Sequence, residues 1–284
     1  IKNTSTYIRS FDLSKNGERV VFSARGDIYS LPATKGITYN LTRTPGVHER
    51  NVTWSPDGKY IAYLSDATGE FEIYIQPVDG SSQAVQLTKN ADTYYYEMVW
   101  SPDSKKILWA DRKFRLRYID VATKAITEIT QSKYGSVGDY KWSPDSRWVV
   151  FAQEADNHFS IITVYDTKNK SLHDITSKWF FSHEPSFSPD GKYIAISSAR
   201  DFTPSYSDIE WNYAYFNMEK LYLILLKKDG KSPFAPENIE VTTDTSNTDK
   251  KKPAETKEKK SETAVEIDFE NIEQRLIPVP VKAS

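Results

Sequence analysis

The chain has 284 residues, no cysteine, and 37 lysines and arginines against 39 aspartates and glutamates. A formal net charge of −2 argues against a nucleic-acid-binding protein, because such proteins need a clustered basic field. The lack of cysteine excludes disulfides, thiolate metal sites and a cysteine nucleophile. Aromatic residues make up 13% of the chain, which favours β-strands. No apolar run approaches the roughly 18 residues of a transmembrane helix, so the sequence predicts no membrane span.

A turn signature repeats along the chain. Trp54-Ser55-Pro56-Asp57-Gly58 recurs with small changes at 100–104, 142–146 and 187–191, and a degenerate copy lies at 13–17. The turn serines Ser14, Ser55, Ser101, Ser143 and Ser188 are 41, 46, 42 and 45 residues apart. Spacings of about 40 to 50 residues are typical of propeller blades, which have four strands each.

The elements of each unit follow in the same order. Serine, proline and glycine suit a type I turn, which we expect to join the first and second strands, with the aromatic residue before it packed between blades. Apolar residues six and eight positions after each turn serine share one face of the second strand. Third strands are predicted at 27–29, 72–75, 116–119, 161–165 and 221–224. Fourth strands are predicted at Leu41-Thr42, Leu87-Thr88, Ile129-Thr130 and Ile175-Thr176, with a delayed one at 275–279.

The predicted fold class is therefore all-β, a β-propeller of four-stranded antiparallel blades. Residues 1–284 form one propeller domain with five blades, at about 7–42, 48–88, 94–130, 138–176 and 184–281. The fifth unit is interrupted by an aromatic-rich insert at 201–217 and by a stretch at 242–263 rich in lysine, glutamate and threonine. That stretch lacks apolar side chains to bury, so we expect it to be disordered.

Several runs resemble the propeller region of tricorn-type proteases. These runs are ARGDIY at 24–29, NLTRTPGVHER at 40–50, SARDFTP at 198–204, KSPFAPE at 231–237 and IDFENIEQR at 267–275. The resemblance is to the second propeller of that family, a seven-bladed ring with TolB-like repeats, and it covers the chain apart from the lysine-rich stretch. It implies that the five blades here are part of a seven-bladed ring.

The resemblance also implies a function. Tricorn-type proteases are S41-like serine peptidases that carry two propellers ahead of a PDZ-like module and a catalytic domain. The catalytic residues belong to domains with no counterpart in these residues, so no catalytic, cofactor-binding or metal-binding residue is expected here. The chain would scaffold the protease and gate peptide access, with peptides, the PDZ-like and catalytic domains and a homo-oligomer as partners. The family implies a cytoplasmic location, and a removed leader would place the protein in the periplasm instead.

Other chemistries find little support. No Gly-x-Ser-x-Gly or His-Glu-x-x-His motif is present, which argues against an α/β-hydrolase and a zinc protease within these residues. The aspartates of the repeated turns are expected to serve the turns. A sialidase would need converging arginines, for which Arg9, Arg50, Arg112, Arg147 and Arg200 are available. A TolB-like platform for protein–protein interaction, without protease activity, is the alternative to the protease scaffold.

Two groups of residues are candidates for contacts. Segments that precede first strands should ring one mouth of the central channel, where they could contact a peptide or be ordinary loop residues. The members of this mouth group are His48, Glu49, Arg50, Tyr94, Tyr95, Tyr96, His183 and Glu184. The aromatic insert could dock another domain or pack on its own blade. Its candidate residues are Phe202, Tyr206, Trp211, Tyr213 and Tyr215.

Overall fold

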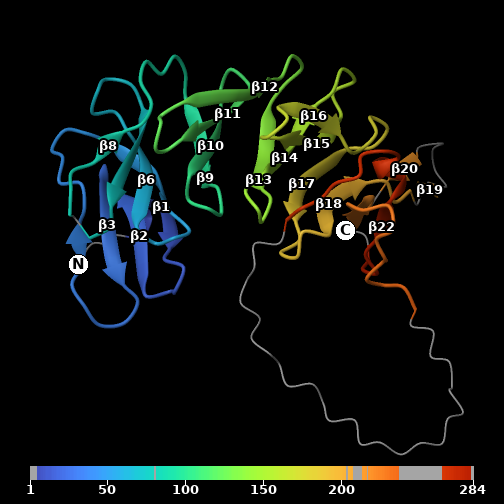
Figure 1. Cartoon of the computed structure of the whole chain (residues 1–284), viewed down its shortest axis with the longest axis horizontal. Coiled ribbons are helices and arrows are strands. Elements are labelled where there is room, and N and C mark those ends of the chain that lie inside the picture. The colour runs from blue at the N-terminus through green and yellow to red at the C-terminus, as the bar shows by residue number, and fades with distance from the viewer. Residues whose placement is uncertain are drawn as a thin grey trace, which may run out of the picture.

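The computed structural model describes residues 5–79, 81–202, 204–206, 213–215, 217–236 and 264–282. Five four-stranded antiparallel sheets follow one another along an arc, from the blue N-terminal sheet to the orange and red C-terminal one (Figure 1). The helices within these ranges are two short 3-10 turns, Ser5–Tyr7 and Ile272–Gln274. The prediction of an all-β fold with five four-stranded antiparallel blades is confirmed.

The first four sheets each use consecutive strands. The first contains β1 (Ile8–Leu13), β2 (Arg19–Ala24), β3 (Asp27–Pro32) and β4 (Tyr39–Asn40). The second contains β5 (Glu49–Trp54), β6 (Tyr60–Ser65), β7 (Glu72–Pro77) and β8 (Val85–Gln86). The third contains β9 (Tyr95–Trp100), β10 (Lys106–Asp111), β11 (Arg115–Asp120) and β12 (Ile126–Gln131). The fourth contains β13 (Val137–Trp142), β14 (Trp148–Glu154), β15 (Ser160–Asp166) and β16 (Ser171–Asp174).

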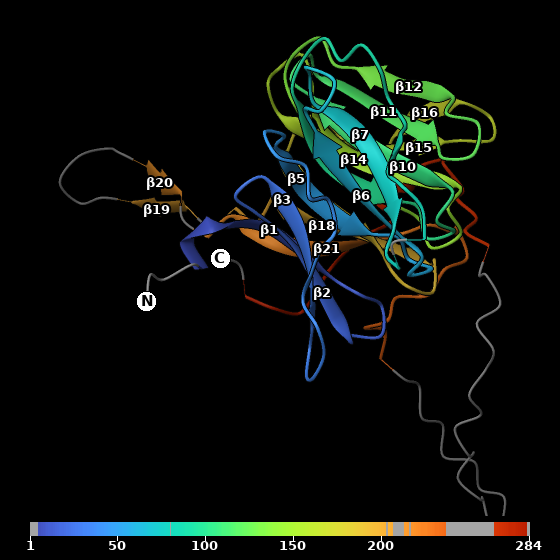
Figure 2. The same cartoon turned by 90° about the vertical axis from the view of Figure 1, so that its left-hand side faces the viewer.

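The fifth sheet is interrupted. It contains β17 (Ser182–Phe187), β18 (Tyr193–Ala199), β21 (Glu219–Leu225) and β22 (Leu276–Pro278). Between β18 and β21, β19 (Pro204–Tyr206) pairs with β20 (Tyr213–Tyr215) in a separate hairpin, which projects from the body of the molecule in Figure 2. The predicted disordered stretch 242–263 lies outside the described residues.

The repeated turn joins the first and second strands of each sheet, as the sequence predicts. In the second sheet, the Gly58 amide donates to the Ser55 carbonyl at 2.8 Å, and the Ser55 hydroxyl donates to Asp57 Oδ1 at 2.6 Å. The Tyr60 amide donates back to Ser55 Oγ at 2.9 Å. The fourth turn position has a positive φ, 75° at Gly58, which glycine adopts at least cost. The turn aspartates are therefore partners of the turns, as expected.

One apolar cluster fills each space between neighbouring sheets. Ile61 and Tyr63, six and eight positions after the turn serine, pack with Val21 and Ile28 of the preceding sheet. Alternate residues of the same strand, such as Leu64, face the following sheet. The aromatic residue before each turn lies in these clusters, and Trp54, Trp100 and Trp142 are 7%, 6% and 7% exposed. The prediction that it packs between blades is confirmed.

Neighbouring turns are also linked directly. The Asp57 amide donates to Ser104 Oγ of the next turn at 3.0 Å, and the Asp103 amide donates to Ser146 Oγ at 3.0 Å. The next turn has Gly191 at the position of this serine, so it offers no hydroxyl to the preceding turn. Val265 bonds the preceding turn instead. The Val265 amide donates to Asp145 Oδ2 at 2.8 Å, and the Val265 carbonyl accepts the indole N–H of Trp148 at 2.9 Å. We call residues 264–269, which run between these turns, the strap.

The fourth strands differ from the prediction. β4, β8 and β16 end before Leu41-Thr42, Leu87-Thr88 and Ile175-Thr176, whereas Ile129-Thr130 lies within β12. The leucine and isoleucine amides still bond the third strand, as Leu41 does to the Ile28 carbonyl at 2.8 Å. Thr88 Oγ1 accepts from the Ile73 amide at 2.8 Å, so the threonine hydroxyl replaces a main-chain acceptor. At these pairs a side chain therefore completes the hydrogen bonding of the third strand.

Candidate functional site

The first strands of the five sheets line the inside of the arc. β1 contacts β5, β5 contacts β9, β9 contacts β13 and β13 contacts β17. Each of these strands carries a register shift in its pairing with the second strand. The shift coincides with a positive φ at Asn51 (54°), Asp139 (49°) and Glu184 (52°). Such bulges change where side chains point, and here they lie four residues before the turn serine in three sheets.

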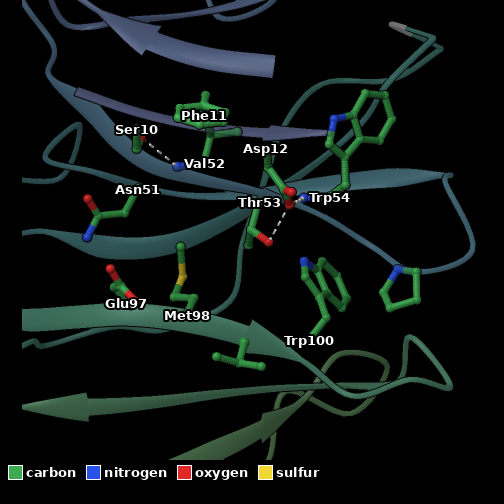
Figure 3. A pocket seen from close by; sticks show the side chains of 12 residues that line it. Ser10, Phe11, Asp12, Asn51, Val52, Thr53, Trp54, Glu97, Met98 and Trp100 are labelled. Atoms are coloured by element: carbon green, nitrogen blue, oxygen red, sulfur yellow. Dashed lines mark hydrogen bonds between the residues drawn. The ribbon is translucent and has the colours of Figure 1, made fainter. Parts of the chain in front are cut away.

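A hollow of about 450 Å³ lies on the inner strands β1, β5 and β9 (Figure 3). Its volume falls within the range of small-ligand pockets. Phe11, Val52 and Met98 supply apolar surface, and Asn51, Thr53 and Glu97 supply polar groups. Trp54 and Trp100 form its wall near the turns.

Hydrogen bonds between the first two sheets fix one side of the hollow. Asp12 Oδ2 accepts from the Trp54 amide at 2.7 Å and from Thr53 Oγ1 at 2.9 Å. The Val52 amide donates to Ser10 Oγ at 3.3 Å (Figure 3). These bonds hold β1 and β5 in a fixed relation without backbone pairing between the two strands.

Two polar side chains of the hollow are free to bind. The Asn51 amide group and the Glu97 carboxylate have no hydrogen bond or ion pair to the described residues, and both line the hollow (Figure 3). Glu97 is exposed, and its main-chain carbonyl accepts from the Tyr140 hydroxyl at 2.6 Å. The arrangement can therefore bind a ligand but shows no catalytic pairing.

The predicted mouth residues of the second and third sheets form an aromatic cluster. The Arg50 guanidinium carbon lies 3.7 Å from the ring centre of Phe71 and 4.3 Å from that of Tyr94. The ring centres of His48 and Phe71 lie 6.0 Å apart in an edge-on arrangement, and those of Tyr94 and Tyr96 lie 5.6 Å apart. Arg50 Nε and Nη2 are buried without an acceptor in the part of the chain that the structure describes. Cation–π contacts thus replace an ion pair at Arg50.

Two of the predicted mouth residues are buried. Glu49 and Tyr95 are each 2% exposed, so a peptide in the channel cannot touch their side chains. Thr44 Oγ1 donates to Glu49 Oε1 at 2.5 Å, and burial raises the pKa of this carboxyl. Tyr95 packs on Trp109 between the second and third sheets, with 5.7 Å between ring centres. Glu49 and Tyr95 are the first residues of β5 and β9, and their side chains point into the interface with the preceding sheet. Both residues are therefore removed from the candidate peptide contacts.

The remaining mouth residues lie on the fifth sheet. His183 Nε2 lies 3.2 Å from Glu219 Oε1, and the His183 ring lies 5.4 Å from that of Phe181. The Glu184 amide donates to Asp139 Oδ2 at 3.0 Å, and the Glu184 side chain is exposed. The fourth sheet lies between His183 and Glu184 and the Arg50 cluster of the second and third sheets, so the structure does not gather all the mouth residues at one point.

The insert is described only in part. Phe202 is 61% exposed, whereas Trp211 and the side chains of Tyr206, Tyr213 and Tyr215 lie outside the described residues. The nearby loop before β17 exposes Trp179 to 82%, and Phe180 and Phe181 to 38% and 42%. Sequence reasoning missed this exposed aromatic run.

Metal and sialidase chemistry find no site in the described residues. No group of three histidine, aspartate or glutamate side chains is placed to hold a metal ion there. Arg147 bonds Asp166, with Nη2 to Oδ2 at 2.7 Å, and Arg200 lies over the rings of Phe180 and Tyr222. Arg50, Arg147 and Arg200 therefore each have separate partners. No helix in the same ranges is long and apolar enough to cross a membrane.

Three residues of the site were absent from the predicted set, namely Asn51, Glu97 and Phe71. A signal for the first two exists in the repeat, because the position four residues before each turn serine is polar in all five units. Its members are Ser10, Asn51, Glu97, Asp139 and Glu184. Phe71 lies in a loop of variable length between β6 and β7, where the repeat gives no alignment.

Comparisons with known proteins agree with this architecture. Residues 8–284 match the family described as the second β-propeller domain of tricorn protease. Tricorn protease homolog 1 of Streptomyces coelicolor is 25% identical over 273 residues, which cover 92% of this chain and 25% of the relative. A putative tricorn-like protease C-terminal subunit of Sulfurisphaera tokodaii is 27% identical over 267 residues, covering 94% of this chain and 28% of the relative. The chain thus spans about a quarter of the length of these relatives.

Solved structures show the same fold. The crystal structure of the tricorn protease matches 99% of this chain and 26% of its own, with a TM-score of 0.75 at 18% identity. A putative TolB from Agrobacterium tumefaciens matches 77% of both chains with a lower TM-score of 0.53 at 20% identity. Because the family match covers nearly the whole chain, this protein belongs to the family of tricorn protease second β-propeller domains.

Proposed function

We propose that this propeller is a non-catalytic part of a serine peptidase, where it scaffolds the assembly and guides peptides along its inner strands to a catalytic domain outside these residues. The observation that carries the proposal is the hollow on β1, β5 and β9, which offers apolar surface together with polar groups that have no partner among the described residues. Extended peptides bind such surfaces through main-chain polar contacts and side-chain pockets. Family membership supports the peptidase as the setting.

Binding without cleavage tests this function. The chain should bind short peptides in calorimetry, and mass spectrometry of the same mixture should recover the peptides intact. A fluorogenic peptide should likewise show no turnover. Peptidase activity that survives purification and is lost on substituting a residue of this chain would contradict a non-catalytic role.

The five sheets are proposed to be part of a seven-bladed ring, because the first sheet has an uncovered apolar face. Leu13 is 56% exposed, whereas Trp54 and Trp100 at the same repeat position are 7% and 6% exposed. Phe11 is 69% exposed against 4% for Val52. Faces with this pattern are covered by a preceding sheet elsewhere in the arc. A hydrophobic dye should bind this face, and a Leu13→Ser variant should bind less of it; unchanged dye binding would refute the assignment.

The six exposed or partly exposed mouth residues are proposed as peptide contacts at the entrance of the channel. They are His48, Arg50, Tyr94, Tyr96, His183 and Glu184. Tyr94 and Tyr96 offer apolar area and a hydroxyl each, which suits variable peptide sequences. A Tyr94→Ala/Tyr96→Ala double variant should weaken peptide binding, and unchanged affinity would remove these residues from the entrance. A cytoplasmic location is proposed for the whole protein on the basis of the family alone.

A protein-interaction platform without protease is the second candidate. The exposed run Trp179, Phe180 and Phe181 favours it, since dense exposed aromatics mark interfaces. The two candidates differ in what this run contacts. A Trp179→Ser variant that loses a protein partner while keeping peptide binding would favour the platform.

A further inference from the structure

We infer that the hollow on β1, β5 and β9 prefers an extended peptide segment that carries a lysine or arginine side chain. Glu97 would pair with the cation, and Asn51 would bond the peptide main chain. The inference rests on the proposed function and names the substrate class for the same channel. It starts from the geometry of these two side chains.

Glu97 is placed to receive a cation. Its carboxylate is exposed and lacks any ion pair to the described residues, while its main-chain carbonyl is fixed by the bond from Tyr140, which is 9% exposed. The neighbouring Met98 is 6% exposed and anchors the strand between the second and third sheets. A charged group on a fixed backbone loses little freedom when it binds.

Asn51 complements a peptide group. Its amide offers donors and an acceptor, which are the groups that a peptide unit pairs with. Its φ is 54°, and its side chain lines the hollow together with that of Glu97 (Figure 3). Arg50, the preceding residue, is held between the rings of Phe71 and Tyr94, so its charge is not the one that the hollow presents.

The apolar part of the hollow suits the stem of a basic side chain. Phe11, Val52 and Met98 lie in its lining. Lysine and arginine bury their methylene groups on such surface while the charge stays near water. A hollow of about 450 Å³ accommodates the stem together with the adjoining peptide units.

Charges along the inner strands favour a cation as well. The repeat position of Glu97 carries Asp139 and Glu184 in the next two sheets, both exposed. The exposed cations on the inner strands are Arg9 of β1 and Lys141 of β13. Three exposed carboxylates against two exposed cations leave a negative balance that attracts a basic peptide, and the attraction weakens as salt rises.

Three peptides that differ at one residue test the preference. Acetylated and amidated hexapeptides with lysine, norleucine or glutamate at the fourth position are titrated by calorimetry. From the usual strength of an exposed ion pair, the lysine peptide should bind about fivefold more tightly than the norleucine peptide. The glutamate peptide should bind most weakly, and raising the salt should shrink both differences.

Two variants and a control locate the effect. Glu97→Gln should equalise the lysine and norleucine peptides, and Asn51→Gly, which keeps the positive φ, should weaken all three alike. Glu128→Gln removes the same charge from the exposed edge strand β12 of the same sheet and should change nothing. Equal effects of Glu97→Gln and Glu128→Gln would overturn the inference.

The outcome also separates this inference from the proposed function. Peptides that bind with no difference between lysine, norleucine and glutamate would refute the preference and leave peptide guidance standing. If none of the three peptides binds, both fail.

Discussion

Alanine substitutions of two glycines at the same turn position test how strongly the strap packs against the turn of the fifth sheet. Gly58 and Gly191 have φ values of 75° and 68°, so alanine is strained equally at both. A Cβ on Gly58 would meet nothing within 4 Å, whereas a Cβ on Gly191 would lie 2.8 Å from Val265 Cγ2. Val265 is 1% exposed and has a stiff side chain, so it cannot move aside freely.

The expected losses follow from these contacts. Left-handed backbone costs alanine about 1–2 kcal/mol, and the lower entropy of its unfolded chain returns part of that. Gly58→Ala should therefore lower the free energy of unfolding by about 1 kcal/mol. Overpacking against Val265 adds about 1–3 kcal/mol, so Gly191→Ala should cost about 2–4 kcal/mol.

Urea unfolding followed by tryptophan fluorescence checks both variants. Trp148 donates its indole N–H to the Val265 carbonyl and reports directly on the strap. Gly191→Ala should also shift the tryptophan emission of the folded protein, to which Trp148 is one of seven contributors, and Gly58→Ala should leave that emission unchanged. Equal losses of stability for the two variants would show that the strap does not press on this turn.

Three further predictions concern buried charges and links between sheets. Burial raises the pKa of Glu49 above its ordinary 4.5, so the stability of the wild type should fall as pH rises from about that value. Glu49→Gln should then gain on the order of 1 kcal/mol at pH 7.5 and nothing at pH 4; a gain that does not depend on pH would contradict this. Asp12→Ala leaves the buried Trp54 amide without its acceptor and should cost about 2 kcal/mol in urea unfolding, more than Asp12→Asn does. Arg50→Met removes two buried unpaired donors but keeps contact with the rings, so the free energy of unfolding should rise by about 1 kcal/mol and the melting temperature should rise with it. A marked fall in the melting temperature would show that the charge itself stabilises the mouth.

The repeat predicts the sheets because turn chemistry is local. Serine, proline and glycine set the turn by themselves, and the alternating apolar residues of the second strand can pack only against neighbouring sheets. Ser104 and Ser146 adopt positive φ at the turn position where Gly58 stands, and their hydroxyls bond the preceding turn. The local turn sequence does not require serine in place of glycine at this position, because the serine hydroxyl acts in a contact between neighbouring units.

The inner face is harder to predict than the sheets. Asn51 adopts a positive φ in the middle of a strand without a glycine to mark it, and the same shift places its side chain in the hollow. The burial of Glu49 follows from a contact with Thr44 of the preceding connection, which the polar sequence of the segment hides. The strap joins Val265 to Trp148 across more than a hundred residues, and no repeat spacing carries such a contact.

Photo-crosslinking tests the central claim that peptides travel along the inner strands. A lysine-containing peptide with a benzophenone group is irradiated with the protein, and mass spectrometry locates the attached residues. Crosslinks should fall on the lining of the hollow, at Phe11, Met98 and their neighbours on β1, β5 and β9. Crosslinks confined to the outer strands β8 and β12, or no specific crosslink at all, would contradict the claim.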